Sequence, residues 1–375
     1  MLDLDRELAS VTKGARNVTL MRKWENPIPW ELDGAYLYTA RIRLEDPSGK
    51  VLDRMEFPFG FREIWTEGRK VMMNGHPSRW RIEWAHFGLT EKSVSFFHLL
   101  GRNVIYEQPN AESWWRAWGD VPYFSQEWLS MADRNGIGVL LPLPSCSRLR
   151  GEFLTNAALE QQYREECGEF IRRYRRHPSV IAWCTSMNAF CPGDGIAPSG
   201  IGIRHPYGQK MEAVLNRSFE IVKKMDSTRL VYGHAEGNLG DLASGNVYPI
   251  FAPVQEVADW PSRWAEKGTM PYWASEYAAV YDGSYFKGKT FLLTEYAAIN
   301  VGRDACRRES LRQLENTLDI GLRSSLHGQI MAEVAPYAPL YWDVQELYIT
   351  ATDRAWRTWG VTAWHYFNFF VGYGN

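Results

Sequence analysis

Carboxylate, histidine and aromatic side chains follow a series of short apolar runs along this 375-residue sequence. The carboxylates in such positions are Glu83, Glu107, Asp194, Glu236 and Glu276. Two carboxyl groups that flank a glycosidic bond can cleave it, one by protonating the leaving group and the other as nucleophile or base. Polar residues also collect at strand ends for reasons unrelated to catalysis, so the pattern indicates a site without defining one. The other members of the set are His86, Asn188, His234, Tyr248, Tyr277, Trp364, His365 and Asn368.

Signatures of other catalytic classes are missing from the sequence. There is no G-x-S-x-G nucleophile elbow, no G-x-x-x-x-G-K-[ST] phosphate loop, no H-E-x-x-H zinc motif and no dinucleotide fingerprint. The five cysteines are an odd number without a C-x-x-C pair, and the eight histidines are far apart. We therefore expect reduced thiols and no tightly held metal or organic cofactor.

Composition narrows the class of protein. The net charge of −2 and the sequence pI near 6.5 leave no basic excess for a phosphate-binding face, which argues against nucleic acid as a partner. No apolar run approaches the roughly 18 residues that span a bilayer, and Met1 to Arg6 lack the features of a signal peptide. The chain as given is expected to be cytoplasmic; a longer exported parent protein would leave its location unknown. Aromatic residues make up 14% of the chain, which suits either stacking on sugar rings or packing in the core.

The first part of the chain has the alternating pattern of β-strands. Apolar residues fall on every second position over residues 36–44 and again over 51–59, with a turn of Asp, Pro, Ser and Gly between them, which predicts a β-hairpin. A third short strand is expected over 61–65. These strands are too few for a closed sandwich of about seven. Residues 1–70 are therefore predicted to form a small, partial immunoglobulin-like β region, whose uncovered apolar face is expected to support homo-oligomer formation.

After Asn74-Gly75 the pattern changes to short apolar runs, each followed by a longer amphipathic stretch, as in parallel strands that are each covered by a helix. Amphipathic helices are predicted over 157–176 and 209–225. Eight such units predict a (β/α)8 TIM barrel over residues 71–375, with an insertion around 281–359 beside the seventh strand. The eight strand candidates are 80–84, 104–106, 137–143, 180–184, 230–232, 246–248, 272–274 and 360–364.

Four sequence runs carry a resemblance to a known family. They are F-G-F-R-E at 59–63, N-G-H-P at 74–77, H-P-S-V-I-A-W at 177–183 and M-P-Y-W-A-S-E-Y at 270–277. In this order they resemble glycoside hydrolase family 2, which includes β-galactosidases, β-glucuronidases and β-mannosidases; the third run is the most specific. The resemblance implies an immunoglobulin-like domain before a (β/α)8 barrel, and a retaining, exo-acting glycosidase with a carbohydrate substrate.

The resemblance also implies two catalytic glutamates, a nucleophile at the end of the seventh strand and an acid/base in an N-E pair after the fourth. Glu276 matches the nucleophile by its setting in P-Y-W-A-S-E-Y. Glu295, in the similar run T-E-Y-A-A, falls within the expected insertion and is the weaker choice. The second match fails, because the sequence after Trp183 is one residue longer than the family pattern and Ala189 follows the asparagine.

Three explanations of the missing glutamate stay open. Another carboxylate acts as acid/base, or the leaving group needs little protonation, or the barrel binds sugar without cleaving it. Asp194, in a Gly/Pro loop, is the preferred substitute and Glu236 is the reserve; a turn-forming role is the alternative for Asp194. The residues expected to bind the sugar are an aromatic platform of Trp183, Tyr248 and Trp364, together with His86, Glu107, Asn188, Tyr277 and His365.

Overall fold

A computed structural model describes residues 21, 23–84, 91–106, 126–144, 150–187, 208–234, 236–247, 258–259, 262, 288–296 and 338–366. Eight parallel strands form its centre. In chain order they are β6 (Trp80–Trp84), β7 (Val104–Tyr106), β8 (Gly138–Pro142), β9 (Val180–Met187), β10 (Leu230–His234), β11 (Ala243–Val247), β12 (Phe291–Tyr296) and β13 (Ala363–Tyr366).

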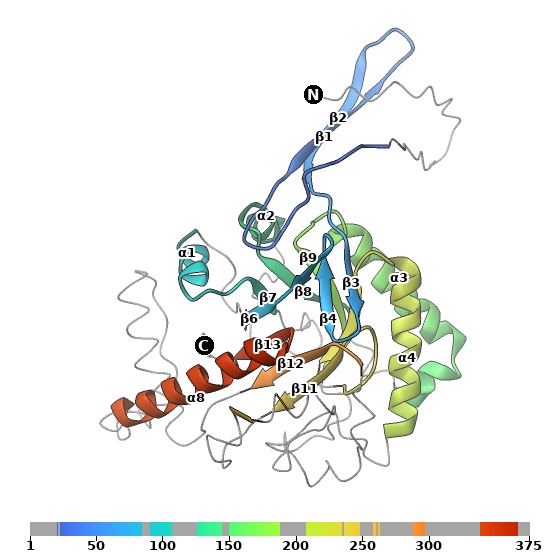
Figure 1. Ribbon diagram of the computed structural model, residues 1–375. Helices are drawn as coiled ribbons and strands as arrows, with labels where there is room; N and C mark the ends of the chain where they lie inside the picture. Colours follow the sequence, from blue (N-terminus) through green and yellow to red (C-terminus); the bar gives the residue numbers. More distant parts are fainter. Residues whose placement is uncertain are drawn as a thin grey trace.

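The order of the strands in the sheet closes the barrel. It runs β10-β9-β8-β7-β6-β13-β12-β11, so that the first strand of the barrel, β6, pairs with the last, β13. At the two ends of this order, β10 and β11 are in contact, and the sheet curls into a nearly closed barrel (Figure 1). The predicted (β/α)8 fold is confirmed.

Alternate residues of each strand supply two separate cores. One set fills the inside of the barrel, for example Ile82, Leu140 and Leu292. The other set, for example Val139 and Val231, faces outward and packs against the helices. Because successive side chains of a strand point to opposite faces, a shift of one residue decides whether a side chain reaches the interior or the helix layer.

The described helices lie outside the strands. They are α1 (Glu91–Leu99), α2 (Gln126–Asn135), α3 (Ala157–Tyr174), α4 (Gly208–Met225) and α8 (Ala338–Trp359), with a short 3-10 helix η2 (Arg150–Leu154) before α3. The two predicted helices are confirmed. Helix α3 begins after Asn156, whose side chain accepts hydrogen bonds from the amides of Ala158 and Leu159. Its buried face repeats every three or four residues, with Tyr163, Cys167, Ile171 and Tyr174.

The predicted hairpin is present before the barrel. Strands β1 (Tyr38–Glu45) and β2 (Val51–Phe59) pair antiparallel and project away from the barrel in Figure 1. The turn between them is held by Asp46, whose carboxylate accepts hydrogen bonds from the amides of Ser48 and Lys50.

A second, three-stranded antiparallel sheet closes the N-terminal end of the barrel. It consists of β3 (Ile64–Glu67), β4 (Lys70–Met73) and β5 (His76–Ser78). Its apolar residues belong to the interior core of the barrel, and the hydroxyls of Thr290 and Thr362 donate to carbonyls in its first turn. The sequence predicted only one strand here, over 61–65. The expected domain boundary after residue 70 falls inside this sheet, within β4.

The seventh strand differs from the prediction. It is β12, residues 291–296, which pairs with β11 on one side and β13 on the other. The predicted seventh strand, residues 272–274, lies outside the described residues. The range 281–359, predicted as an insertion beside the seventh strand, therefore contains that strand, followed by α8. This correction changes which glutamate stands at the end of the seventh strand.

Candidate active site

Active sites of (β/α)8 barrels lie at the C-terminal ends of the strands. At this end Tyr106 of β7 faces His234 of β10, with ring centroids 5.1 Å apart. One step deeper, Cys184 of β9 lies opposite Tyr232 of β10, and both are fully buried. Burial raises the pKa of the Cys184 thiol to about 12 and raises that of the Tyr232 phenol as well. Both groups therefore stay uncharged at neutral pH and line the interior without acting as nucleophiles.

Glu236, two residues beyond β10, is a fully buried carboxyl group at this end of the barrel. Its amide donates to the Ser244 hydroxyl at 3.0 Å, and that hydroxyl donates to the carbonyl of Gly233. The side chain folds back over Gly233: a Cβ built on that glycine would lie 2.4 Å from Glu236 Cγ. Any other residue at position 233 would collide with Glu236, so the glycine is what allows this placement.

Ser186 of β9 is the neighbour of Glu236 across the strands. Its Oγ lies 2.7 Å from the same point over Gly233. The side chain is fully buried, and within the described part of the chain its hydroxyl has no hydrogen-bond partner. No sequence pattern marks Ser186, Gly233 or Ser244. The bulge in β9 between Cys184 and Met187 interrupts the alternation of inward and outward positions, so counting along the strand from Ala182 does not identify Ser186.

Two residues of the expected sugar platform are placed in the core, which corrects that expectation. Trp183 packs in the outer core beneath α3 and α4, and its indole N–H donates to Asp226 at 3.0 Å. Trp364 of β13 packs against Trp356 of α8, with ring centroids 5.9 Å apart. The inward neighbours of these two residues are Cys184 and Ala363. Strand alternation therefore turns both indoles away from the barrel interior.

Glu83 is also turned away from the interior. It lies on β6 beside Ile82, which faces inward, and its carboxylate is 3.6 Å from Nε of Arg102. Of the other predicted site residues, one is placed by its backbone and seven lie outside the described part of the chain. His365 lies on β13, paired with Ile82, and the structure describes its backbone position. Those outside the described residues are Glu276, Asp194, His86, Glu107, Asn188, Tyr248 and Tyr277.

Glu295 lies near the C-terminal end of β12, where its backbone pairs with Asn246 of β11. The register of β12 shifts just before it. Between Leu293 and Tyr296 three steps along β12 match two along β13, and a shift also occurs against β11. One extra residue in a strand is a β-bulge, and bulges near strand ends commonly re-aim a side chain at an active site.

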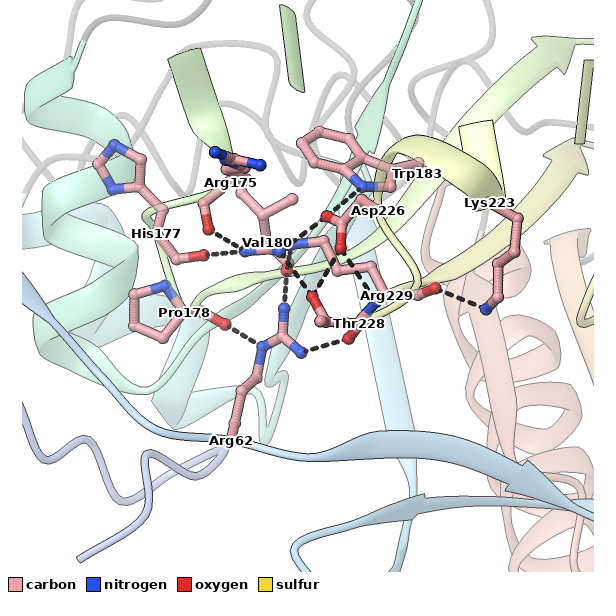
Figure 2. A network of polar contacts seen from close by, with 10 residues as sticks. All are labelled: Arg62, Arg175, His177, Pro178, Val180, Trp183, Lys223, Asp226, Thr228 and Arg229. Atoms are coloured by element: carbon pink, nitrogen blue, oxygen red, sulfur yellow. Dashed lines mark hydrogen bonds and ion pairs between the residues drawn. The ribbon is translucent and has the colours of Figure 1, made fainter. Parts of the chain in front are cut away.

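Two of the family-like runs, at 59–63 and 177–183, meet at the opposite, N-terminal end of the barrel (Figure 2). Arg62 donates to the carbonyls of Pro178, Val180 and Thr228 at 2.7, 2.6 and 3.2 Å. Arg229 binds Asp226 at 2.8 Å and lies 5.5 Å from the Trp183 ring centroid. These contacts join the F-G-F-R run to the H-P-S-V-I-A-W run and stabilise the fold.

Asp226 is the charged centre of this network. Its burial acts to raise the pKa, but the charge of Arg229 and hydrogen bonds from Thr228 and Trp183 outweigh burial and hold the pKa at about 2. A second buried pair lies nearby, in which His177 Nδ1 is 2.6 Å from Asp133. Both ion pairs lie at the end of the barrel opposite to Glu236. They stabilise the barrel and take no part in its chemistry.

The described residues contain neither an arrangement of metal ligands nor a helix suited to span a membrane. No group of three or more His, Cys, Asp and Glu side chains among them is arranged to hold a metal ion. None of the helices among them is long and apolar enough to span a bilayer.

Family models match two parts of the chain. The model described as "Glycosyl hydrolases family 2, TIM barrel domain" matches residues 121–298. The model described as "Glycosyl hydrolases family 2" matches residues 5–62. The first match covers barrel strands β8 to β12, and the second covers the β region that contains the hairpin.

The chain is also similar to individual β-glucuronidases. It is 28% identical over 210 residues to that of Paenibacillus borealis, a match of 53% of this chain and 34% of the relative. It is 27% identical over 162 residues to that of Canis lupus familiaris, covering 40% and 23% of the two chains. The chain thus spans about a third or less of the length of these relatives.

Solved structures share the fold. A Bifidobacterium dentium β-glucuronidase complexed with coumarin-3-O-glucuronide superposes with a TM-score of 0.57 at 18% identity, covering 92% of this chain and 48% of the other. A Ruminococcus gnavus β-glucuronidase in complex with a C6-substituted uronic isofagomine gives 0.56 at 19% identity, covering 92% and 52%.

Proposed function

The chain belongs to family 2 of the glycosyl hydrolases, and we propose that it hydrolyses a β-linked glycoside with retention of configuration at the anomeric carbon. The family match and the similarity to β-glucuronidases support this proposal. Because those relatives are named as β-glucuronidases, aryl β-glucuronides are the first substrates to test. Exo action, with one terminal sugar in the barrel mouth, remains part of the proposal.

The nucleophile we propose is Glu295. The observation that carries this assignment is that the seventh strand of the barrel is β12, and Glu295 lies near its C-terminal end. The resemblance placed the nucleophile at the end of the seventh strand, and Glu276 was preferred because residues 272–274 were expected to be that strand. The bulge that immediately precedes Glu295 also supports the assignment, because it is a feature suited to directing a side chain into a site.

The chemistry proceeds in two displacements. In the first, the Glu295 carboxylate forms a bond to the anomeric carbon while the bond to the glycosidic oxygen breaks and a general acid protonates that oxygen. In the second, water attacks the anomeric carbon, the ester to Glu295 breaks, and the same group, now a base, accepts a proton from the water. The product keeps the configuration of the substrate.

Two isosteric variants, Glu295→Gln and Glu276→Gln, test the assignment. The amide cannot form the glycosyl ester, so Glu295→Gln should lose nearly all hydrolysis of 4-nitrophenyl β-glucuronide, whereas Glu276→Gln should retain it. Circular dichroism checks that both variants fold. The reverse pattern of activities would return the role to Glu276.

The second candidate function is a barrel that binds sugar without cleaving it. Ala189, at the place where the family sequence carries its acid/base, favours this reading. A wild-type chain that binds glucuronic acid by calorimetry but hydrolyses none of the aryl β-glucuronides, β-galactosides and β-mannosides would establish it in place of the first proposal.

A further inference from the structure

We propose that the outer edge of β2 binds a second copy of this chain, and that the two β2 strands pair antiparallel about a twofold axis at Met55. The proposal concerns a surface remote from the barrel and does not depend on glycosidase activity. Its grounds are the open edge of the hairpin, the direction of the backbone groups along β2, and a pattern of charges that complements itself.

The outer edge of β2 is open among the described residues. Strands β1 and β2 form a sheet of two, and no other described strand pairs with either of them. The hairpin projects away from the barrel, so the barrel does not obstruct the approach of a second hairpin (Figure 1). The edge of a sheet carries a row of backbone N–H and C=O groups that can pair with a strand of another chain.

Two observations show which backbone groups of β2 point outward. The amide of Arg54 donates to the Asp53 carboxylate at 2.8 Å, which directs this N–H away from β1. Pro58 pairs with Thr39, and a proline lies in a strand where the missing N–H would face outward. Outward positions alternate along an antiparallel strand, so Arg54, Glu56 and Pro58 share the outer edge. Pairing with a second β2 would exchange the carboxylate contact of the Arg54 amide for a main-chain carbonyl.

The charges on β2 select one register for this pairing. Within the hairpin Arg54 lies directly opposite Arg43, which is unfavourable, whereas Glu56 lies opposite Arg41 at 3.0 Å. A twofold axis at Met55 places Arg54 of each copy opposite Glu56 of the other, because these residues lie one step to either side of the axis. Each Arg54 thereby gains a carboxylate partner. Met55 is also the middle residue of β2, so the two strands overlap along their whole length.

Strand β1, the other edge of the hairpin, lacks this complementarity. A twofold axis at Ile42, near the middle of β1, would place Arg41 of each copy opposite Arg43 of the other. Like charges directly opposite each other disfavour such pairing. An interface that joins the same strand of two copies is closed by its own symmetry. The predicted assembly is therefore a dimer and not a filament.

Apolar side chains on the opposite face of the hairpin add to the contact. Ile42 of β1 lies opposite Met55 of β2, and these side chains are 46% and 59% exposed. Pairing across the axis would bring the two Met55 side chains together and form a row of four apolar residues. A single strand pairing makes a small interface, so we expect a reversible dimer with a micromolar dissociation constant.

Sedimentation velocity of the wild-type chain and two charge variants tests the interface. The wild type should change from monomer to dimer between roughly 1 and 300 µM. Arg54→Glu and Glu56→Arg each bring like charges together at both contacts and should each weaken the dimer by at least about tenfold. An equimolar mixture of the two variants should dimerise again, because the acidic side chains of one then face the arginines of the other.

Lys23→Glu is the control for net charge. Lys23 is exposed and pairs with Glu25 outside the hairpin, and its substitution changes the net charge as much as Arg54→Glu does. Its dissociation constant should stay within about twofold of wild type, since charges outside the contact have little effect on affinity.

Disulfide cross-linking tests the register without a change of charge. Paired positions at the axis of such a ladder have Cα atoms about 4.5–5.5 Å apart, which a disulfide spans. Oxidation of Met55→Cys should therefore yield a covalent dimer on a non-reducing gel, with the wild-type cysteines as the baseline. Leu44→Cys is the matched control, because Leu44 is 53% exposed but lies on β1, at the outside of the joined sheet. It should remain monomeric.

A wild-type chain that stays monomeric over the whole concentration range would overturn the proposal. So would a dimer that both charge variants leave unchanged, or equal cross-linking of Leu44→Cys and Met55→Cys, since either shows contact through another surface. Slow hydrogen exchange of the Arg54 and Glu56 amides in a monomeric sample would identify another part of the chain as the occupant of this edge, and would also overturn it.

Discussion

Arg62 donates a hydrogen bond to the main-chain carbonyl of Val180 at 2.6 Å, across 118 positions of the chain. The same guanidinium also donates hydrogen bonds to the carbonyls of Pro178 and Thr228, and these three bonds form a junction between distant parts of the chain. The segment that follows the hairpin is thereby fixed to the starts of β9 and β10. The most family-like parts of the sequence thus hold the barrel together at the end opposite to Glu236.

We expect Arg62→Met to lower the free energy of unfolding by roughly 3 kcal/mol, because three carbonyls, two of them on the buried residues Pro178 and Val180, lose a charged donor. Urea denaturation measures the change. Arg41→Met is the control, since Arg41 pairs with Glu56 on the exposed hairpin, and such pairs contribute about 0–1 kcal/mol. Equal effects of the two substitutions would show that the junction is not a stabilising contact.

The variant Trp183→Phe distinguishes a role of this residue in core packing from a role in binding the sugar. The phenyl ring keeps most of the packing but loses the hydrogen bond to Asp226, so stability should fall by about 1–2 kcal/mol. The value of kcat/KM for an aryl β-glucuronide should change less than about twofold. A marked rise in KM without loss of stability would place Trp183 at the sugar instead.

The low pKa of Asp226 predicts that the folded protein loses a defined part of its stability in acid. Its pKa of about 2 in the folded protein lies below the value of about 3.9 expected in the unfolded chain. The unfolded state therefore binds the proton more tightly. The stabilisation is complete above about pH 4 and is lost as the pH falls toward 2. Urea midpoints measured from pH 5 to pH 2.5 should fall less steeply for Asp226→Asn than for wild type. Parallel curves would contradict this account.

Periodicity in the sequence was enough to predict the barrel, the hairpin and two helices, because the alternation of apolar residues is local. Strand seven was missed for a local reason as well. The tetrapeptide Glu-Tyr-Ala-Ala occurs at both 276–279 and 295–298, and each copy follows a short apolar run. Pairing with β11 and β13, which depends on residues far away in the chain, is what distinguishes them.

The face of the barrel sheet to which a side chain points was harder to predict than the strands themselves. Trp183 and Trp364 look like rim aromatics in the sequence, yet their inward neighbours show that both face the helices. Bulges in β9 and β12 change the alternation near the strand ends, and a one-residue bulge leaves no mark in the composition of a strand. Glu236 was identified from its position after an apolar run, but its support by Gly233 and Ser244 required the folded chain.

Covalent trapping with 2-deoxy-2-fluoro-β-D-glucuronosyl fluoride tests the central claim most directly. Fluoride leaves without help from a general acid, and the 2-fluoro group destabilises the oxocarbenium-like transition state of hydrolysis, so the glycosyl ester should accumulate. Mass spectrometry of the intact protein should show one added fluoro-sugar, and peptide mapping should locate it on Glu295. A label on Glu276, or an unlabelled protein that still hydrolyses aryl β-glucuronides, would contradict a nucleophile at the end of β12.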